Sequence, residues 1–252
     1  MKYFFDSSDT KEASDAKDKY ISKYNQYNPE DADIIVPIGG DGFLLKTLHD
    51  YYKINKPFFG INFGSIGFLM NNKNIDDLNN IISSALSIEL KPLRMKAKNN
   101  NEKIYESIAF NEVSIMRQTH QAAKINIKIN DINRMEELIC DGILVSTAAG
   151  STAYNLSAHG SIIPLDSKLL ALTPISAFRP RRWRGALLSE NTKINFFIKN
   201  SNIRPTSVTA DHNEFRDIEE VEVTSSDKIK CHLLFDNNHS MDERILKEQF
   251  FS

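Results

Sequence analysis

A short apolar run followed by a glycine-rich turn constrains the fold of this chain more than any other feature. Residues 34–38 read Ile-Ile-Val-Pro-Ile, and Gly39, Gly40, Asp41 and Gly42 follow directly. An apolar run of this length is typical of a buried strand, and residues 43–48 predict the start of a helix. The turn between them contains three glycines and a single carboxylate. The sequence therefore predicts a strand–turn–helix unit with little side-chain bulk at its corner.

The composition of this turn has two interpretations. Glycine allows a ligand to approach the backbone closely, and the start of a helix offers unpaired N–H groups to an anion. Phosphate or nucleotide contact is therefore one interpretation, with Asp41 as the side chain placed for proton transfer. The other is an ordinary turn in which Asp41 caps the helix, because Gly-Gly and Asp-Gly are common turn dipeptides. The local pattern alone does not decide between them.

The first 90 residues alternate between strand and helix patterns. Strands are predicted at residues 2–5, 33–38 and 57–61, and helices at 9–24, 43–52 and 75–86. Alternating units of this kind indicate a parallel sheet, whose ligands lie beyond the carboxyl ends of the strands. A second glycine-rich segment, residues 62–68, follows the strand at 57–61. We therefore expect both glycine turns at the same edge of the sheet.

After residue 91 the pattern changes to alternating strands, which indicate a mainly antiparallel β domain. The predicted strands are residues 104–116, 124–130, 138–147, 193–199, 218–223 and 228–235. Helical periodicity is found near residues 151–158 and in the tail at 241–250. We therefore predict an α/β domain over residues 1–90 and a β domain over 91–235, with the tail 236–252 packing back on the first domain.

Two polar segments of the β region are candidate binding sites. Asn111 and Glu112 lie in the middle of a predicted strand, so one of them must point inward, which is costly unless it meets a ligand or partner. The alternative is an edge strand with both groups solvated. Residues 141–154 repeat the plan of strand, small-residue turn and helix, with room for a flat ligand and hydroxyls from Ser151, Thr152 and Tyr154. The alternative there is a close-packed corner capped by Ser151.

Composition and charge exclude several classes of function. The net charge of −2 gives no electrostatic case for binding nucleic acid or an anionic membrane. No apolar run approaches the ~20 residues that span a bilayer, and the N-terminus lacks the apolar core of a signal peptide, so we expect a cytoplasmic protein. No histidine, cysteine or carboxylate set has metal-ligand spacing, and no metal site is assigned. The basic run at residues 179–184 either neutralises phosphates or an acidic partner, or forms a solvated loop.

Four segments, taken together, resemble the NAD kinase family over almost the whole chain. They are the turn at residues 39–42, the Asn111-Glu112 pair, residues 141–157, and Asp211-His212. The familiar P-loop and the Gly-x-Gly-x-x-Gly fingerprint are both absent, so the common nucleotide motifs do not explain the first turn. Members of the family often have Thr after Gly-Gly-Asp-Gly, where this chain has Phe43, and Pro-Thr or Pro-Ser in place of Ala148-Ala149.

The resemblance implies transfer of the terminal phosphoryl group of ATP, or of polyphosphate, to the 2′-hydroxyl of the adenosine ribose of NAD, giving NADP. It implies a Rossmann-like α/β domain followed by a β-sandwich-like NAD-binding domain. Asp41 would be the general base, and Gly39, Gly40 and Gly42 would form the phosphate-donor turn with Mg²⁺ on ATP. The residues implied to bind NAD are Asp41, Gly42, Asn111, Glu112, Asp141, Ala149, Thr152, Ala153, Tyr154, Asn155, Leu156, Ser157 and His212.

The resemblance further implies a homodimer or homotetramer. Two alternatives to NAD kinase activity stay open at this point. One is another kinase with the same turn that acts on a lipid or sugar phosphate, and the other is a non-catalytic dinucleotide-binding module.

Overall fold

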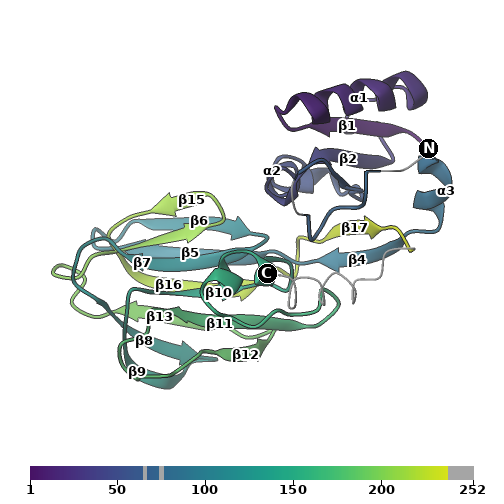
Figure 1. Cartoon of the computed structure of the whole chain (residues 1–252). Helices are drawn as coiled ribbons and strands as arrows, with labels where there is room; N and C mark the ends of the chain where they lie inside the picture. The colour runs from purple at the N-terminus through teal and green to yellow at the C-terminus, as the bar shows by residue number, and fades with distance from the viewer. Residues whose placement is uncertain (65–66, 74–76, 238–252) are drawn as a thin grey trace. The chain divides into compact units, whose positions relative to one another are not determined.

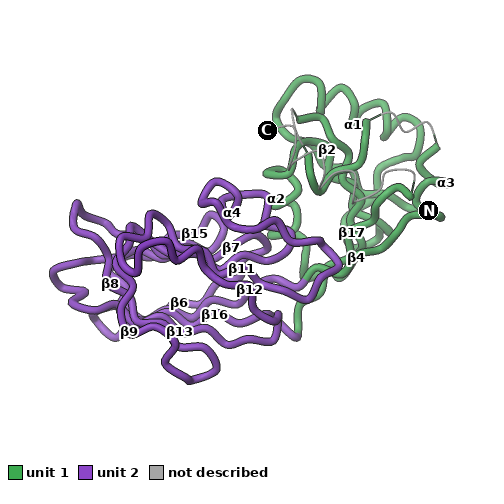
Figure 2. The backbone as a smooth tube through the Cα atoms, turned by 60° about the horizontal axis from the view of Figure 1, so that its bottom comes forward, with its two compact units in different colours: residues 1–90, 228–252 green, residues 91–227 purple. Residues whose placement is uncertain are grey.

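The computed structural model describes residues 1–64, 67–73 and 77–237, and its chain forms two compact units (Figure 2). The first unit comprises residues 1–90 and 228–252, and the second comprises residues 91–227. The expected packing of the tail 236–252 on the first domain falls almost entirely on residues outside the described ranges. Each unit has its own hydrophobic core.

The first unit is an α/β layer around a parallel sheet with strand order β1-β2-β3 (Figure 1). Its helices and strands are β1 (Tyr3–Ser7), α1 (Lys11–Tyr24), β2 (Ile34–Gly39), α2 (Asp41–Tyr51), the 3-10 turn η1 (Tyr52–Ile54), β3 (Ile61–Asn62), α3 (Leu78–Ser83), β4 (Leu86–Leu90) and β17 (Cys231–Phe235). All six residues of β2 are buried, as the continuous apolar run predicts. Side chains of α1 and α3 pack on Ile34, Val36 and Ile38 in one cluster.

The C-terminal strand of the first unit differs from the sequence-based assignment. Residues 228–235 were expected in the β domain, but β17 pairs antiparallel with β4 in the first unit. Buried Asn71 ties this strand pair to the parallel sheet: its Nδ2 donates to the carbonyls of Gly60 and Leu234, at 3.1 and 2.9 Å. Its Oδ1 accepts from the N–H of Asp236 at 2.9 Å. Such long-range pairing leaves no signal in the local sequence.

The helix predicted over residues 75–86 is shorter in the structure. Helix α3 covers Leu78–Ser83, and Leu86 starts strand β4 with its side chain 51% exposed. The prediction that the helix extends to residue 86 was therefore wrong. Leu78 and Ile82, which do lie in the helix, are buried. Residues 75 and 76 lie outside the described ranges.

The second unit is a sandwich of two six-stranded antiparallel sheets. Its strands are β5 (Leu93–Asn99), β6 (Ile104–Ala109), β7 (Glu112–Arg117), β8 (Ala123–Ile129), β9 (Ile132–Cys140), β10 (Gly142–Ser146), β11 (Leu169–Ile175), β12 (Ala186–Ser189), β13 (Ile194–Ile198), β14 (Thr206–Ala210), β15 (Asn213–Phe215) and β16 (Ile218–Ser225), and η2 (Ala149–Thr152) and α4 (Tyr154–Ser157) follow β10. One sheet has the order β12-β11-β10-β7-β14-β15 and the other β6-β5-β16-β13-β8-β9. Their inner faces share one apolar core, which confirms the predicted fold class.

The single strand predicted over residues 104–116 is two strands in different sheets. Strand β6 pairs with β5, whereas β7 pairs with β10 and β14. The chain crosses between the sheets at Phe110 and Asn111. The prediction that Asn111 and Glu112 sit mid-strand was therefore wrong, since Glu112 opens β7 and Asn111 precedes it. The strand predicted at 138–147 is likewise divided, into β9 and β10, at Asp141.

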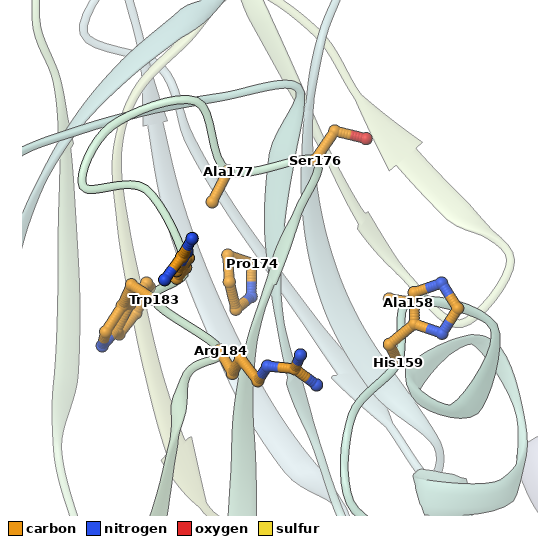
Figure 3. A pocket seen from close by; sticks show the side chains of 8 residues that line it. Ala158, His159, Pro174, Ser176, Ala177, Trp183 and Arg184 are labelled. Atoms are coloured by element: carbon orange, nitrogen blue, oxygen red, sulfur yellow. The ribbon is translucent and has the colours of Figure 1, made fainter.

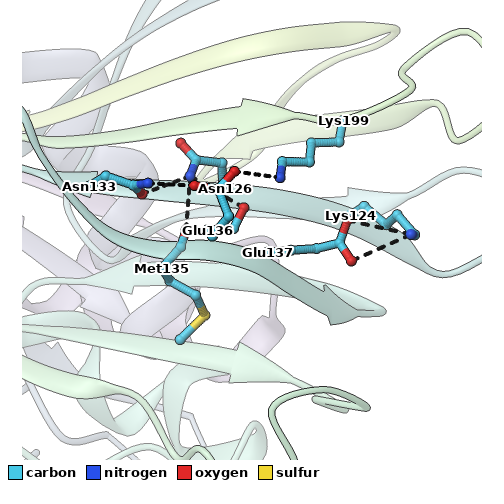
Figure 4. Close-up of polar contacts among 7 residues, drawn as sticks. All are labelled: Lys124, Asn126, Asn133, Met135, Glu136, Glu137 and Lys199. Atoms are coloured by element: carbon cyan, nitrogen blue, oxygen red, sulfur yellow. Dashed lines mark hydrogen bonds and ion pairs between the residues drawn. The ribbon is translucent and has the colours of Figure 1, made fainter.

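The buried amide of Asn126 fills an irregularity between β8 and β9 (Figure 4). The register of this pair shifts around Ile127. The Nδ2 of Asn126 donates to the Asn133 side chain at 2.8 Å and to the Met135 carbonyl at 2.9 Å. The irregular part of the ladder is therefore held by one specific side chain, which bonds both to a side chain and to a backbone carbonyl of β9. Within the described residues no helix is long and apolar enough to cross a membrane.

We expect Asn71→Ala to lower the free energy of unfolding by about 2–4 kcal/mol, because it removes three hydrogen bonds made by a completely buried amide. Urea unfolding measures this. The control is Asn28→Ala, which removes one exposed 3.3 Å bond to Asp31 and should change stability by less than about 0.5 kcal/mol. Equal stabilities for the two variants would contradict the role of Asn71.

Candidate active site

The carboxylate of Asp41 is held in one orientation by two backbone N–H groups. Oδ2 accepts from the N–H of Phe68 at 2.7 Å, and Oδ1 accepts from that of Leu69 at 3.0 Å. Helix α2, expected to start at residue 43, begins at Asp41 itself, with Gly40 as its N-cap. Asp41 therefore lies in the first helical turn, where the helix dipole favours negative charge. It does not cap the helix, because no side chain makes a cap bond there.

The glycines around Asp41 differ in whether the packing of the protein requires a residue without a side chain. A Cβ on Gly39 would lie 2.9 Å from the Cβ of Phe43, and one on Gly64 would lie 3.1 Å from the Cα of Gly40. These glycines let the turns after β2 and β3 approach each other, and Gly39 pairs with Asn62 in the parallel ladder. Gly42 is exposed, and a Cβ there would meet no atom of the described residues within 4 Å. Protein packing therefore does not require glycine at position 42, which leaves the space above it open to a ligand.

A second carboxylate, that of Asp211, fixes the chain where it crosses between the two sheets of the sandwich. Asp211 follows β14 with φ of 52°, and its Oδ2 accepts from Phe110 N–H at 2.7 Å. Its Oδ1 accepts from the N–H groups of Asn111 and Glu112, at 3.0 and 3.3 Å. Sequence reasoning used Asp211 only as part of a motif and chose its neighbour His212 as a site residue. His212 is exposed.

The turn after β10 packs directly on the backbone of Asn111. The hydroxyl of Thr147 donates to the Phe110 carbonyl at 2.6 Å, and it accepts from Gly150 N–H at 3.0 Å. The N–H of Thr147 donates to the Asn111 carbonyl at 2.9 Å. A Cβ on Gly150 would lie 2.3 Å from that same carbonyl oxygen. Two segments that sequence analysis selected separately are therefore one rigid cluster.

Glu112 brings an unsatisfied acceptor into this cluster. Its Oε2 is buried and has no hydrogen-bond partner among the described residues. Burial, with the nearby negative charge of Asp211 as a smaller contribution, raises the pKa of Glu112 to about 7. Buried acceptors are normally paired, so an unpaired one indicates a position for a ligand donor. Of the expected dinucleotide contacts, Glu112 has the clearest physical signature.

Asp141 and Tyr154 flank the same cluster. Asp141 accepts a 2.6 Å charged bond from Arg117 Nε, and the guanidinium also donates to the Thr119 carbonyl. The Tyr154 hydroxyl lies 3.5 Å from the Met116 sulfur. Burial is the main cause that raises the pKa of Tyr154, and the charges of Glu112 and Asp141 add to it. Asp141 is thus positioned by Arg117, which carried no signal in the sequence.

The remaining expected site residues follow in η2 and α4. Ala149 is buried, Thr152, Ala153 and Leu156 are half-buried, and Ser157 is exposed. Asn155 is completely buried, and its amide bonds to the Ser151 and Ser161 carbonyls and to the Thr173 hydroxyl. Its side chain therefore supports the shape of the segment. The described residues contain no cluster of three His, Cys, Asp or Glu side chains arranged to hold a metal ion.

Comparison with known proteins matches sequence in both units of the chain to the two domains of one family. Residues 2–89 match the family model described as the ATP-NAD kinase N-terminal domain, and residues 110–242 match the ATP-NAD kinase C-terminal domain. The chain belongs to the NAD kinase family. The NAD kinase of Xylella fastidiosa is 48% identical over 98% of this chain and 95% of its own, and that of Rickettsia felis is 53% identical over 90% and 89%.

Solved NAD kinase folds agree with this membership. The structure of yeast NADH kinase complexed with NADH matches with a TM-score of 0.85 and 18% identity, over 100% of this chain and 88% of that one. An Archaeoglobus fulgidus NAD kinase in complex with ATP matches with a TM-score of 0.77 and 20% identity, over 98% of both chains. At these identities the likeness concerns the fold. In this family member Asp41 lies in the first unit, and Asn111, Glu112, Asp141 and Tyr154 lie in the second.

Substituting Asp211→Asn should release the amides of Phe110, Asn111 and Glu112, because a neutral amide replaces an acceptor-only carboxylate that serves all three. We expect their hydrogen exchange to accelerate by roughly tenfold or more. The matched control is Asp217→Asn: Asp217 has a φ of 59° and is exposed, and Asn tolerates that conformation. Unchanged exchange in Asp211→Asn would contradict the assigned role.

The raised pKa of Glu112 predicts a pH-dependent loss of stability. Between its ordinary value of 4.5 and about 7 the folded chain retains a proton that the unfolded chain releases, so stability falls as pH rises through this window. Relative to Glu112→Gln, which cannot titrate, the wild type should lose on the order of 3 kcal/mol between pH 4 and 8. Denaturant unfolding of both proteins at several pH values measures this difference. A difference that does not vary with pH would refute the assigned titration.

Proposed function

We propose that this chain transfers the terminal phosphoryl group of ATP to the 2′-hydroxyl of the adenosine ribose of NAD, giving NADP. Family membership and the names of the relatives support the reaction, and the yeast and archaeal structures were obtained with NADH and with ATP respectively. The observation that carries the proposal is the Asp41 carboxylate, fixed by two N–H groups beside the open backbone at Gly42.

Asp41 is proposed as the general base. A ribose hydroxyl is a weak nucleophile, and a carboxylate at hydrogen-bond distance that takes its proton assists attack on the γ-phosphorus. The N–H groups of Phe68 and Leu69 fix both oxygens of the carboxylate in one orientation. Holding the carboxylate in place before substrate binds reduces the reorganisation needed at the moment of transfer.

The second unit is proposed to bind NAD. Glu112 Oε2, which lacks a partner among the described residues, is suited to accept from ribose hydroxyls, and Asn111 beside it can both donate and accept. Tyr154 offers an aromatic face, and Ala149 and Ala153 leave room beside it. Asp141, held by Arg117, is suited to accept from an amide or hydroxyl donor. Thr152, Leu156, Ser157 and His212 remain weaker proposed contacts.

The phosphate donor is proposed to bind at the turn of Gly39, Gly40 and Gly42, against the N-terminus of α2. The helix offers unpaired N–H groups and a positive dipole end to the phosphates. Mg²⁺ is commonly held by substrate phosphates with one or two carboxylates, which fits a chain whose described residues form no three-ligand cluster. The ion would neutralise charge that develops on the phosphate oxygens.

The oligomeric state of the chain and its cellular location are also proposals. Homodimers or homotetramers are expected from the family resemblance. Light scattering on the purified chain tests the oligomeric state. A cytoplasmic location remains the proposed one.

Two other activities are distinguished by acceptor assays. A kinase that acts on lipid or sugar phosphates would phosphorylate diacylglycerol or a hexose phosphate in preference to NAD. A non-catalytic dinucleotide module would bind NAD without forming an ATP-dependent product. Parallel incubations with ATP or polyphosphate identify the donor. The Glu112 cluster favours the dinucleotide, since its buried acceptor suits a polyhydroxyl ligand better than an acyl chain.

Asp41→Asn should lower kcat for NADP formation by roughly 10²–10⁴-fold, because an amide cannot take the hydroxyl proton. The KM for NAD should change only a few-fold, since the proposed contacts to NAD lie mainly in the second unit. Coupling to an NADP-specific dehydrogenase measures both constants.

The matched control is Asp50→Asn, which removes an exposed carboxylate from the last turn of the same helix. It should retain near-normal kcat. NADP production by Asp41→Asn at the wild-type rate would exclude Asp41 as the base.

A further inference from the structure

A basic pocket in the second unit lies outside the proposed contacts to NAD (Figure 3). Its volume is about 420 Å³, within the range of sites that hold small organic ligands. It is lined by Ala158, His159, Pro174, Ser176, Ala177, Arg182, Trp183 and Arg184. Trp183 and His159 lie at opposite sides of the view, with Pro174 and Arg184 between them. The pocket therefore combines two guanidinium groups with an indole and an imidazole.

The arginines here carry uncompensated positive charge. Four of the six residues at 179–184 are arginine, in a chain whose net charge is −2. Arg179 and Arg181 lie 5.8 Å from the ring of Phe178, which is exposed. Within the described ranges, neither Arg182 nor Arg184 makes an ion pair or a side-chain hydrogen bond. Ten guanidinium N–H donors are therefore directed to solvent or to a ligand.

The loop that carries these side chains is anchored at both ends. At its start, the N–H of Ile139 donates to the Arg179 carbonyl at 2.8 Å. At its end, Gly185 has a φ of 98°, and a Cβ there would lie 1.9 Å from the Leu172 carbonyl oxygen. Trp183, half-buried, packs against the apolar core of the sandwich. A loop fixed in this way holds the pocket walls in place, unlike a freely solvated charge run.

We propose that this pocket binds a phosphate-bearing ligand, with Arg182 and Arg184 on its phosphates and Trp183 against its flat or apolar part. Guanidinium groups match phosphate oxygens in geometry and charge, often with two parallel bonds. An indole beside them adds a face on which a nucleobase can stack. Phosphates of this kind occur both in nucleotides and in inorganic polyphosphate, and the experiment below separates the two sources.

Trp183 is the single tryptophan of the chain, so intrinsic fluorescence reports on this pocket directly. Titration with tripolyphosphate and, separately, with ADP should give saturable changes in emission. Tighter binding of ADP would assign a nucleotide, and equal or tighter binding of tripolyphosphate would assign inorganic polyphosphate. The absence of a saturable change with both ligands would overturn the proposal.

Arg182→Gln and Arg184→Gln should each raise the Kd by roughly tenfold, because each removes a charged hydrogen bond. The matched control is Arg134→Gln, which removes the same charge from an exposed position on β9 of the same unit and should change the Kd less than twofold. If all three substitutions weaken ligand binding equally, the effect comes from the overall charge of the chain, and the proposed binding site is overturned. Thermal melting verifies that each variant is folded.

Asn111→Ala separates this pocket from the proposed NAD contacts. It should leave the Kd for tripolyphosphate within about twofold of the wild type, whatever it does to NADP formation. Loss of the fluorescence change in this variant would assign the signal to ligand binding at the cluster around Glu112. It would overturn the pocket proposal and leave the proposed kinase function untouched.

Discussion

The architecture of the second unit depends on one carboxylate at the point where the chain changes sheets. Where the chain crosses from β6 to β7, three consecutive backbone N–H groups need acceptors, and unpaired buried N–H groups are costly. Asp211 accepts from all three. Because that crossing also carries Asn111 and Glu112, the same bonds that allow the sandwich to form fix the position of its candidate ligand groups.

Asp41 repeats this arrangement in the first unit, with a different consequence. Its two acceptor bonds from Phe68 and Leu69 join the turn after β2 to the segment that follows β3. Parallel strands place both turns at one edge of the sheet, and glycines let them meet. The same carboxylate that holds these two segments together is the proposed general base. Structure and proposed catalysis are therefore linked through the same two oxygens.

Local sequence patterns predicted the helices and strands that are specified by residues close together in the sequence. The buried strand β2 and its helix were evident from an apolar run and a turn, and the β-rich character of the second unit from alternation. The break between β6 and β7 was missed because neither Gly nor Pro marks it and its partner Asp211 lies about 100 residues away. The pairing of β17 with β4 spans more than 140 residues, so it left no local pattern. Arg117 was missed for the same reason, since its role depends on Asp141, which lies 24 residues away between β9 and β10.

The central claim is that Asp41 receives the proton of the 2′-hydroxyl of NAD. A crystal structure of the chain with NAD bound tests it most directly. The account predicts an Asp41 carboxylate oxygen within about 2.6–3.2 Å of the 2′-oxygen, with the bonds from Phe68 and Leu69 retained. The claim would be contradicted if the 2′-oxygen lay too far from Asp41 for a single water molecule to bridge them. It would also be contradicted if a different side chain that can take the proton contacted the 2′-oxygen.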